Sequence, residues 1–195
     1  SSQKTSAAEL LEKLSDIELV SIIKNFGEER YSKRIVRAIR KEQTERPIIT
    51  TGQLSRLVAK VVNSPRHSRI HPATRTFQAL RIYVNDELGE LKRGLEAAER
   101  MLAPGGRLCV VTFHSLEDRI VKEFFKLKSG DVPRSSRHMP TCETNISEPT
   151  FKMVFRGGKK ATESEITINT RSRSAKMRAA VRTLAPSWLG EKKYD

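Results

Sequence analysis

The sequence predicts an α/β fold with a central parallel strand, joined to an all-helical unit. An almost unbroken apolar run, rich in valine, covers residues 108–113, and such runs are typical of parallel strands that helices bury on both faces. Apolar residues at helical spacing precede this run and follow it. Residues 7–62, by contrast, show helical spacing alone, so we expect a compact unit of helices there.

The polar residues after the predicted strand form the first candidate site. The helix before the strand, with Leu91 and Leu95 in its apolar stripe, should end at Pro104 because proline cannot continue a helix. The strand ends on His114–Asp118, where a second helix begins. In open α/β sheets, ligands bind beyond the carboxyl ends of the strands, so these five residues lie where chemistry is expected.

The predicted helical unit has capping residues at three helix starts and a basic face on one helix. Ser6, Ser15 and Thr50 are each followed three residues later by Glu or Gln, the pattern of a capping box at a helix start. A further helix is predicted over 28–43, with six cations outside its apolar stripe. These cations are either an ordinary solvated surface or contacts to nucleic-acid phosphates. The predicted apolar stripe consists of Tyr31, Ile35, Ala38 and Ile39.

A polar stripe marks the helix expected after Pro72. Phe77, Leu80 and Val84 should face the core, while polar side chains recur on the other faces. On composition alone, this pattern describes a surface helix of a basic protein. Tyr83 could pack in the core or stack on an RNA base, and the sequence leaves both open.

The C-terminal part is expected to complete the sheet with antiparallel edge strands at 150–155 and 175–184. A glycine turn, a capped helical turn at 162–165 and a basic loop lie between them. We expect a loop over 128–148 and a loose tail over 185–195. The two faces of the last strand carry Ala175, Met177, Ala179 and Val181, and Lys176, Arg178, Ala180 and Arg182.

The composition indicates a polyanionic partner. The 195 residues carry 37 Lys plus Arg against 23 Asp plus Glu, a formal net charge of +14, and this excess favours nucleic acid. No apolar run is long enough to cross a membrane and no signal-peptide core is present. We therefore expect no membrane partner and a cytoplasmic location, with a mitochondrial or plastid matrix as the alternative.

The cysteines and histidines predict neither a metal site nor a thiol nucleophile. Cys109 falls inside the predicted buried strand and Cys142 in a polar loop, and neither has a ligand neighbour at zinc spacing. A nucleophile pair of Cys142 and His138 lacks a third group to orient it. We therefore expect two structural thiols and no metal.

Four longer segments resemble the MraW/RsmH family over about 6–184: His71–Arg81, Asn85–Leu88, Phe113–Arg119 and Arg171–Arg178. Members are class I, S-adenosylmethionine-dependent enzymes that methylate N4 of a cytidine in small-subunit (16S) ribosomal RNA. The resemblance implies the C-terminal part of a Rossmann-like methyltransferase sheet. It further implies a helical substrate-recognition subdomain at 1–70, an α/β part at 71–184, and small-subunit rRNA or the ribosomal subunit as partner.

The glycine-rich turn and the acidic residue that hold S-adenosylmethionine in this family have no match. We therefore expect the cofactor-binding strands to be absent and the chain alone to be inactive. It is either a piece of a longer methyltransferase or a non-catalytic RNA-binding protein derived from one. Its apolar strand would then be a sheet edge, so we expect a homo-oligomer, completion by a second polypeptide, or poor solubility.

The resemblance also implies a pocket that holds the target base with its amine in line with the methyl donor. His114, Ser115, Glu117 and Asp118 are the predicted catalytic residues on its wall. For Glu117 and Asp118 the alternative role is stabilisation of a helix N-terminus. The predicted RNA-binding residues are Arg34, Arg37, His71, Thr74, Arg75, Arg81, Asn85, Arg171, Arg173, Lys176 and Arg178.

Overall fold

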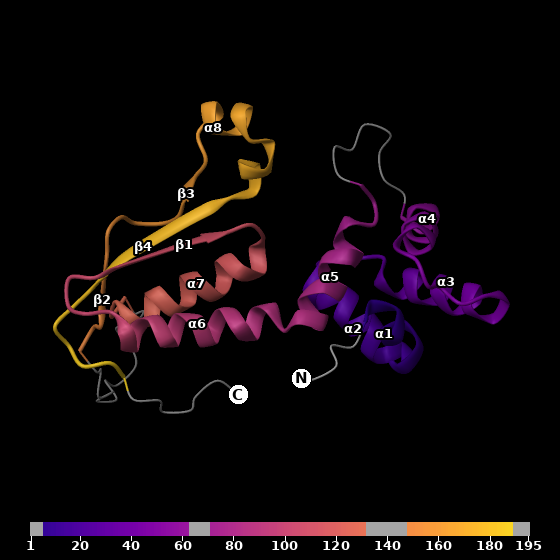
Figure 1. Ribbon diagram of the computed structural model, residues 1–195, viewed down its shortest axis with the longest axis horizontal. Helices are drawn as coiled ribbons and strands as arrows, with labels where there is room; N and C mark the ends of the chain where they lie inside the picture. The colour runs from indigo at the N-terminus through magenta and orange to yellow at the C-terminus, as the bar shows by residue number, and fades with distance from the viewer. Residues whose placement is uncertain (1–5, 63–70, 132–147, 189–195) are drawn as a thin grey trace, which may run out of the picture. The chain divides into compact units, whose positions relative to one another are not determined.

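In the described residues of the N-terminal part, the secondary structure consists of helices alone, as the apolar spacing predicts (Figure 1). The structure is a computed structural model that describes residues 6–62, 71–131 and 148–188. The chain divides into a first unit, Ser1–Glu87, and a second unit, Leu88–Asp195. The first unit contains α1 (Ala7–Lys13), α2 (Asp16–Gly27), α3 (Ser32–Glu45), α4 (Thr51–Val61) and α5 (Thr74–Asn85).

The predicted caps are confirmed at three helix starts. The side chains of Ser6, Ser15 and Thr50 each accept a hydrogen bond from the backbone N–H three residues on. The predicted start of the next helix at residue 28 is wrong. Glu28 adopts a left-handed conformation, with φ 50°, and Glu29 accepts a 2.9 Å hydrogen bond from the Tyr31 N–H, so a turn precedes α3.

The core of the first unit lies between its helices. At the end of α2, a Cβ on Gly27 would lie 2.5 Å from the carbonyl oxygen of Arg75, so α5 can approach only a glycine there. Val36 is buried although the predicted stripe of α3 omits it, whereas Ala38 is only half-buried. The core includes Leu19, Ile23, Ile35, Ile39, Val58 and Leu80.

One cation predicted on the exposed basic face of α3 is structural. The guanidinium of Arg40 lies 2.6 Å from Asp16 and donates to the backbone carbonyls of Leu11 and Leu14. These carbonyls stand at the end of α1, where helices leave acceptors unsatisfied. Arg40 therefore joins α3 to α1 and the start of α2.

The second unit combines two long helices with a small antiparallel sheet. The sheet order is β1-β4-β2, with β3 also paired to β4. Thr112 stands opposite Lys176, and Arg107 opposite Val181. The elements are α6 (Glu87–Met101), β1 (Arg107–Thr112), α7 (Ser115–Lys128), β2 (Phe151–Met153), β3 (Lys159–Lys160), α8 (Glu163–Ile168), the 3₁₀ helix η1 (Thr170–Ser174) and β4 (Lys176–Arg182).

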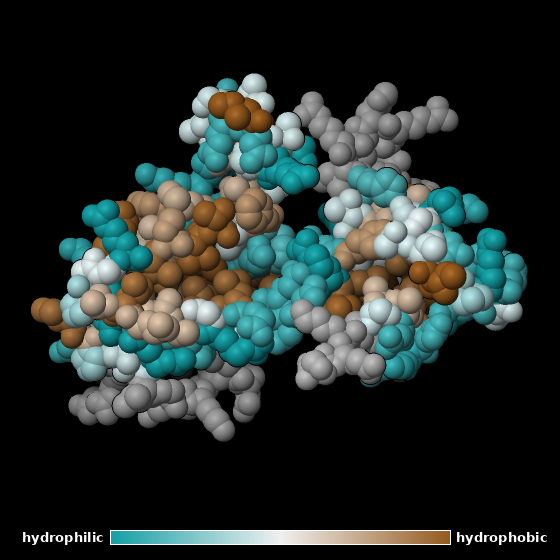
Figure 2. Space-filling view, viewed as in Figure 1, coloured by the Kyte–Doolittle hydropathy of each residue, from teal (hydrophilic) through white to brown (hydrophobic). Residues whose placement is uncertain are grey.

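The strand predicted to be central and parallel is an edge strand in the described sheet. Among the described strands, β1 pairs only with β4, and the pairing is antiparallel. Its alternate residues are exposed, including Cys109 and Val111, the latter at 49%. The predictions of burial on both faces and of a buried Cys109 are therefore wrong, because in the described structure the core and helices lie against one face only. Figure 2 shows the apolar surface over β1 and β4.

The covered face of β4 is the one that carries its arginines. Arg178, Ala180 and Arg182 are buried, whereas Met177, Ala179 and Val181 are half-buried. Within the core, Ala180 packs against an aromatic cluster of Phe124, Phe125 and Phe151. Arg182 donates to the backbone carbonyls of Glu99, Thr150 and Thr183.

The structure differs from two predictions, one about the C-terminal tail and one about the unit that contains α5. Residues 185–188 are packed rather than loose: Ala185 is 8% exposed, and the Trp188 Nε1–H donates to the carbonyl of Glu148 at 2.9 Å. α5, which the sequence groups with the α/β part, belongs to the first compact unit. Most of the predicted loop, with His138 and Cys142, lies outside the described residues.

Candidate functional site

A pocket of about 490 Å³ opens where β1 ends and α7 begins. Its wall combines the last residues of β1, one face of α7, and the junction of η1 with β4. We call it the strand-tip pocket. Its lining residues are Thr112, Phe113, His114, Ser115, Asp118, Arg119, Lys122, Ser174 and Lys176.

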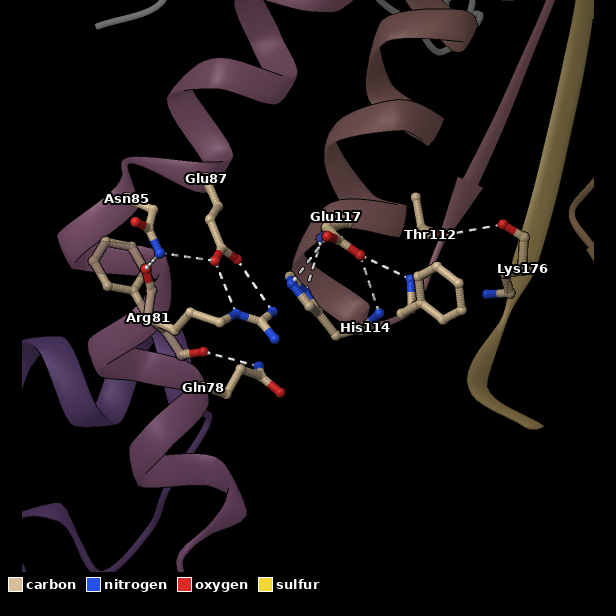
Figure 3. Close-up of polar contacts among 10 residues, drawn as sticks. Gln78, Arg81, Asn85, Glu87, Thr112, His114, Glu117 and Lys176 are labelled. Atoms are coloured by element: carbon tan, nitrogen blue, oxygen red, sulfur yellow. Dashed lines mark hydrogen bonds and ion pairs between the residues drawn. The ribbon is translucent and has the colours of Figure 1, made fainter. Parts of the chain in front are cut away.

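A reciprocal capping box holds the turn at the tip of β1 (Figure 3). The Nδ1 atom of His114 accepts a hydrogen bond from the Glu117 N–H at 3.3 Å. The Glu117 carboxylate accepts in return from the backbone N–H groups of Phe113 and His114, at 2.8 and 3.3 Å. A histidine thus fills a position that Ser or Thr commonly occupies. Both side chains fix the strand-to-helix turn beside the pocket.

The same bond sets the tautomer of His114. Because Nδ1 accepts, the neutral ring carries its proton on Nε2. That atom is buried and 3.3 Å from a Glu117 carboxylate oxygen, without the geometry of a hydrogen bond. His114 therefore serves first as a helix cap, and its catalytic role stays a prediction.

Asp118 is the anchor for two cations of β4. Its carboxylate lies 2.7 Å from the Lys176 ammonium, and the Arg178 guanidinium donates to both carboxylate oxygens, at 2.7 and 3.2 Å. The Arg178 hydrogen bonds, with a smaller contribution from Lys176, lower the pKa of Asp118 although partial burial opposes this. Asp118 is therefore ionised at neutral pH and ties α7 to β4.

The variant Asp118→Asn should destabilise the second unit by ~2 kcal/mol at neutral pH, because hydrogen bonds to charged groups are lost. A carboxyl whose pKa is depressed by folding stabilises the fold fully above its unfolded pKa, near 3.9, and loses this effect as pH falls through its folded pKa. Urea unfolding from pH 7 to pH 3 should therefore show the two proteins converging in acid. The exposed Glu123→Gln is the control, and an undiminished gap at low pH would contradict the assignment.

A second pocket, of about 460 Å³, lies in the first unit between α4 and α5. The Arg81 guanidinium at its edge donates to both carboxylate oxygens of Glu87, at 2.8 and 3.1 Å, and the Asn85 amide donates to the Arg81 carbonyl at 3.1 Å (Figure 3). We call it the helical pocket. Its lining residues are Ser55, His71, Thr74, Phe77, Gln78 and Arg81.

Comparison with known proteins decides the family. The model of the MraW methylase family matches residues 1–183. The chain belongs to the MraW methylase family. The "Ribosomal RNA small subunit methyltransferase H" of Methylobacterium sp. (strain 4-46) is 55% identical over 183 residues, which cover 94% of this chain and 54% of that protein.

Two further relatives of the same name extend the comparison. The protein of Paramagnetospirillum magneticum is 52% identical over 94% of this chain and 57% of its own length. That of Bartonella henselae is 51% identical over 96% of this chain and 53% of its own length. The chain thus spans about half the length of the curated relatives it matches.

The segments that carry the MraW resemblance supply residues to both pockets. His114, Ser115, Asp118 and Lys176 line the strand-tip pocket. His71, Thr74 and Arg81 line the helical pocket. The structure therefore groups the predicted site residues into two sets, one in each unit.

Other predicted residues lie outside both pockets. Glu117 caps α7 without lining the pocket. Arg178 is 7% exposed and held by Asp118, which is unfavourable to its predicted phosphate contact. Arg75 donates to the Glu28 carbonyl at 3.4 Å. The remaining predicted RNA-binding arginines are exposed on the surface: Arg34 and Arg37 on α3, and Arg171 and Arg173 on η1.

Sequence reasoning missed several lining residues. Arg119 lies four positions after Ser115, and Lys122 lies four positions after Asp118, so the helical period could have placed both on the pocket face of α7. Phe113, 54% exposed, was assigned to the buried strand. Gln78 belongs to the polar stripe predicted for the helix after Pro72, although it was not named as a site residue. Ser55 gave no local signal, because only the packing of α4 beside α5 brings it to the pocket. The core prediction for Phe77 is confirmed, since its ring packs against the first core while lining the helical pocket.

Proposed function

We propose that the chain is the RNA-recognition part of a methyltransferase that modifies N4 of a cytidine in 16S rRNA. The observation that supports this is the strand-tip pocket, whose wall combines an exposed aromatic ring with hydroxyl and cationic side chains. The names of the relatives supply the substrate class. In this proposal the strand-tip pocket receives the target base.

Phe113 is the proposed stacking platform for the base. Its ring is 54% exposed at the pocket wall, and enzymes that act on a base must unstack it and replace the lost stacking. The hydroxyls of Ser115 and Ser174 are the proposed acceptors for the protons of the exocyclic amine. Asp118 is a positioning residue, because both of its oxygens already bind cations of β4.

The described residues do not form a cradle for S-adenosylmethionine. In this family such a cradle is a glycine-rich turn between a strand and a helix. Among the described residues, β1 leads into α7 through Phe113 and His114, and β3 leads into α8 through Ala161 and Thr162, so neither turn contains a glycine. The described glycines with positive φ, Gly105, Gly130 and Gly157, stand in turns that do not open a helix. The roles proposed for this chain therefore concern RNA binding. In this proposal, S-adenosylmethionine is bound by the part of the family's fold that contains the glycine-rich turn.

The exposed face of α3 is proposed to bind RNA phosphates. Arg34 and Arg37 are exposed there, and the guanidiniums of Arg30 and Arg34 lie 4.8 and 5.4 Å from the Tyr31 ring centroid. Stacking on the ring orders these arginines while leaving their donors available to phosphate. A non-catalytic RNA-binding protein is the second candidate, favoured by the missing cradle.

A chimera tests the proposed function. If this chain replaces the matched region of the Methylobacterium relative, the chimera should transfer methyl groups from S-adenosylmethionine to cytidine N4 of 16S rRNA. Phe113→Ala in the chimera should lower kcat/KM by roughly 10-fold or more, since stacking on a base is worth ~1–3 kcal/mol. Methylation is measured by mass spectrometry of digested rRNA.

The control variant is Met101→Ala, which removes an exposed apolar side chain from the end of α6, outside both pockets, and should leave kcat/KM unchanged. A folded chimera without transfer would favour the non-catalytic candidate. Equal losses in both variants would exclude a specific role for Phe113.

A further inference from the structure

The segment between β2 and β4 carries exposed cations that line neither pocket. We define the basic arm as Arg156, Lys159, Lys160, Arg171 and Arg173. All five are exposed, and within the described ranges no acidic side chain forms an ion pair with them. Several other cations are paired, such as Arg40 with Asp16 and Arg93 with Glu90. Two arginines of the arm carry an RNA prediction from the sequence, whereas Arg156, Lys159 and Lys160 carry none.

One cation of the arm, Lys160, faces a like charge on the neighbouring strand β4. β3 pairs with β4 so that Lys160 stands opposite Lys176, and like charges directly opposite each other destabilise a sheet. Asp118 balances Lys176, whereas Lys160 has no described counter-charge. An external anion would relieve this repulsion.

Packing holds the first half of the arm in place. A Cβ on Gly158 would lie 2.9 Å from the Lys176 side chain and 3.4 Å from the Arg178 guanidinium carbon, so this turn lies close against the side chains of β4. The Lys159 ammonium lies 4.7 Å from the Phe155 ring centroid. The cations of β3 are therefore carried on an ordered turn.

The second half of the arm is ordered by a buried serine. Ser172 is 4% exposed, and its hydroxyl donates to the Asn169 carbonyl at 2.8 Å. A 3₁₀ helix has three residues per turn, so the residues before and after Ser172 point away from its buried side. Both are arginines and both are exposed. Ordered cations lose less conformational entropy on binding than mobile ones.

We propose that the basic arm binds the phosphodiester backbone of RNA next to the nucleotide in the strand-tip pocket, an inference that rests on the proposed function. The chain itself provides the connection. Ser174 and Lys176 line the pocket, and Arg173 immediately precedes them. A strand of RNA that leaves the pocket past Lys176 meets η1 on one side and β3 on the other.

The salt dependence of RNA binding by the full chain tests the arm. With a labelled single-stranded oligoribonucleotide, the triple variant Arg156→Gln, Lys159→Gln, Lys160→Gln should reduce the slope of log K against log salt by about 2, since each phosphate contact to a single strand contributes ~0.7. Lys159→Arg with Lys160→Arg should keep the original slope. The control removes three exposed lysines elsewhere, with Lys24→Gln, Lys60→Gln and Lys126→Gln, and should also keep it.

An unchanged slope in the folded triple variant would overturn the arm's role, as would equal losses in variant and control. Binding to phosphatidylserine vesicles that depends on the arm, with RNA binding unaffected, would assign the arm to lipid instead and also overturn it. Failure of the arm differs from failure of the proposed function, because a chimera that methylates 16S rRNA normally with the arm neutralised contradicts only the arm. A chimera without transfer, whose RNA binding still depends on the arm, contradicts only the methyltransferase assignment.

Discussion

Replacing Phe125 by alanine should destabilise the second unit by ~3–5 kcal/mol, the range observed when a buried aromatic residue is truncated. Phe125 is 1% exposed, and its ring centroid lies 5.6 Å from that of Phe124 and 5.9 Å from that of Phe151. These three rings join α7 to β2. A small sheet and two helices have few other buried side chains to compensate for the loss.

Trp188 provides the measurement for this unit, because it is the only tryptophan in the chain. Urea unfolding monitored by its fluorescence should show the shift in midpoint. Phe113→Ala is the matched control: this ring is 54% exposed, so its removal should cost less than ~1 kcal/mol. Similar losses in the two variants would show that the aromatic cluster does not carry the stability of the unit.

Glu99→Leu should be comparably damaging, at ~3–5 kcal/mol, because it leaves a buried cation without its partner. The side chains of Glu99 and Lys128 are 3% and 10% exposed, and their charged atoms lie 2.9 Å apart. The other carboxylate oxygen of Glu99 accepts a 2.7 Å hydrogen bond from the Thr150 hydroxyl. The Lys128 ammonium also lies 4.2 Å from the Trp188 ring centroid, so the fluorescence of Trp188 reports changes around Lys128.

A second substitution separates loss of the ion pair from loss of packing. Buried pairs can often be replaced by apolar residues of similar volume at little cost, so Glu99→Leu with Lys128→Met should recover most of the lost stability. The coupling energy from this double-mutant cycle measures the pair. Additive losses would mean that each side chain acts through packing alone.

Local signals predicted the helical part of this fold well. Ser15 and Thr50 bond the backbone as their spacing to Glu18 and Gln53 requires, because a capping box is made within four consecutive residues. The start of α3 was misplaced because the left-handed Glu28 breaks a pattern that otherwise reads as continuous helix. Such a turn shortens the helix by a few residues and leaves the spacing of its apolar residues unchanged.

The sheet was harder to predict because its environment is set by distant segments. The run at 108–113 is apolar except for Thr112, yet only one of its faces is covered in the described structure, so composition could not identify the exposed side. The covered face of β4 contains Arg178 and Arg182, which long-range bonds to Asp118 and Glu99 make compatible with burial. Hydropathy alone would have turned this strand the other way.

The strand-tip pocket was predicted in part for the same reason. The segment 113–119 is contiguous, so its residues were identified together. Ser174 comes from the end of η1 and Lys176 from the start of β4, and only Lys176 was among the predicted site residues. Their place beside α7 depends on strand pairing between residues more than fifty positions apart in the sequence, a relation that the residues themselves do not display.

The arginines on the covered face of β4 make strand slippage costly. Moving β4 by one residue would turn every side chain to the opposite face, placing Met177 against the Asp118 carboxylate and leaving the guanidinium of Arg178 outside. The bonds of Arg178 to the Asp118 carboxylate and of Arg182 to the Glu99 backbone carbonyl would be lost in a single step. The middle of this strand consists of the small residues Ala179, Ala180 and Val181, which would fit several alignments, and the two arginines hold it in one.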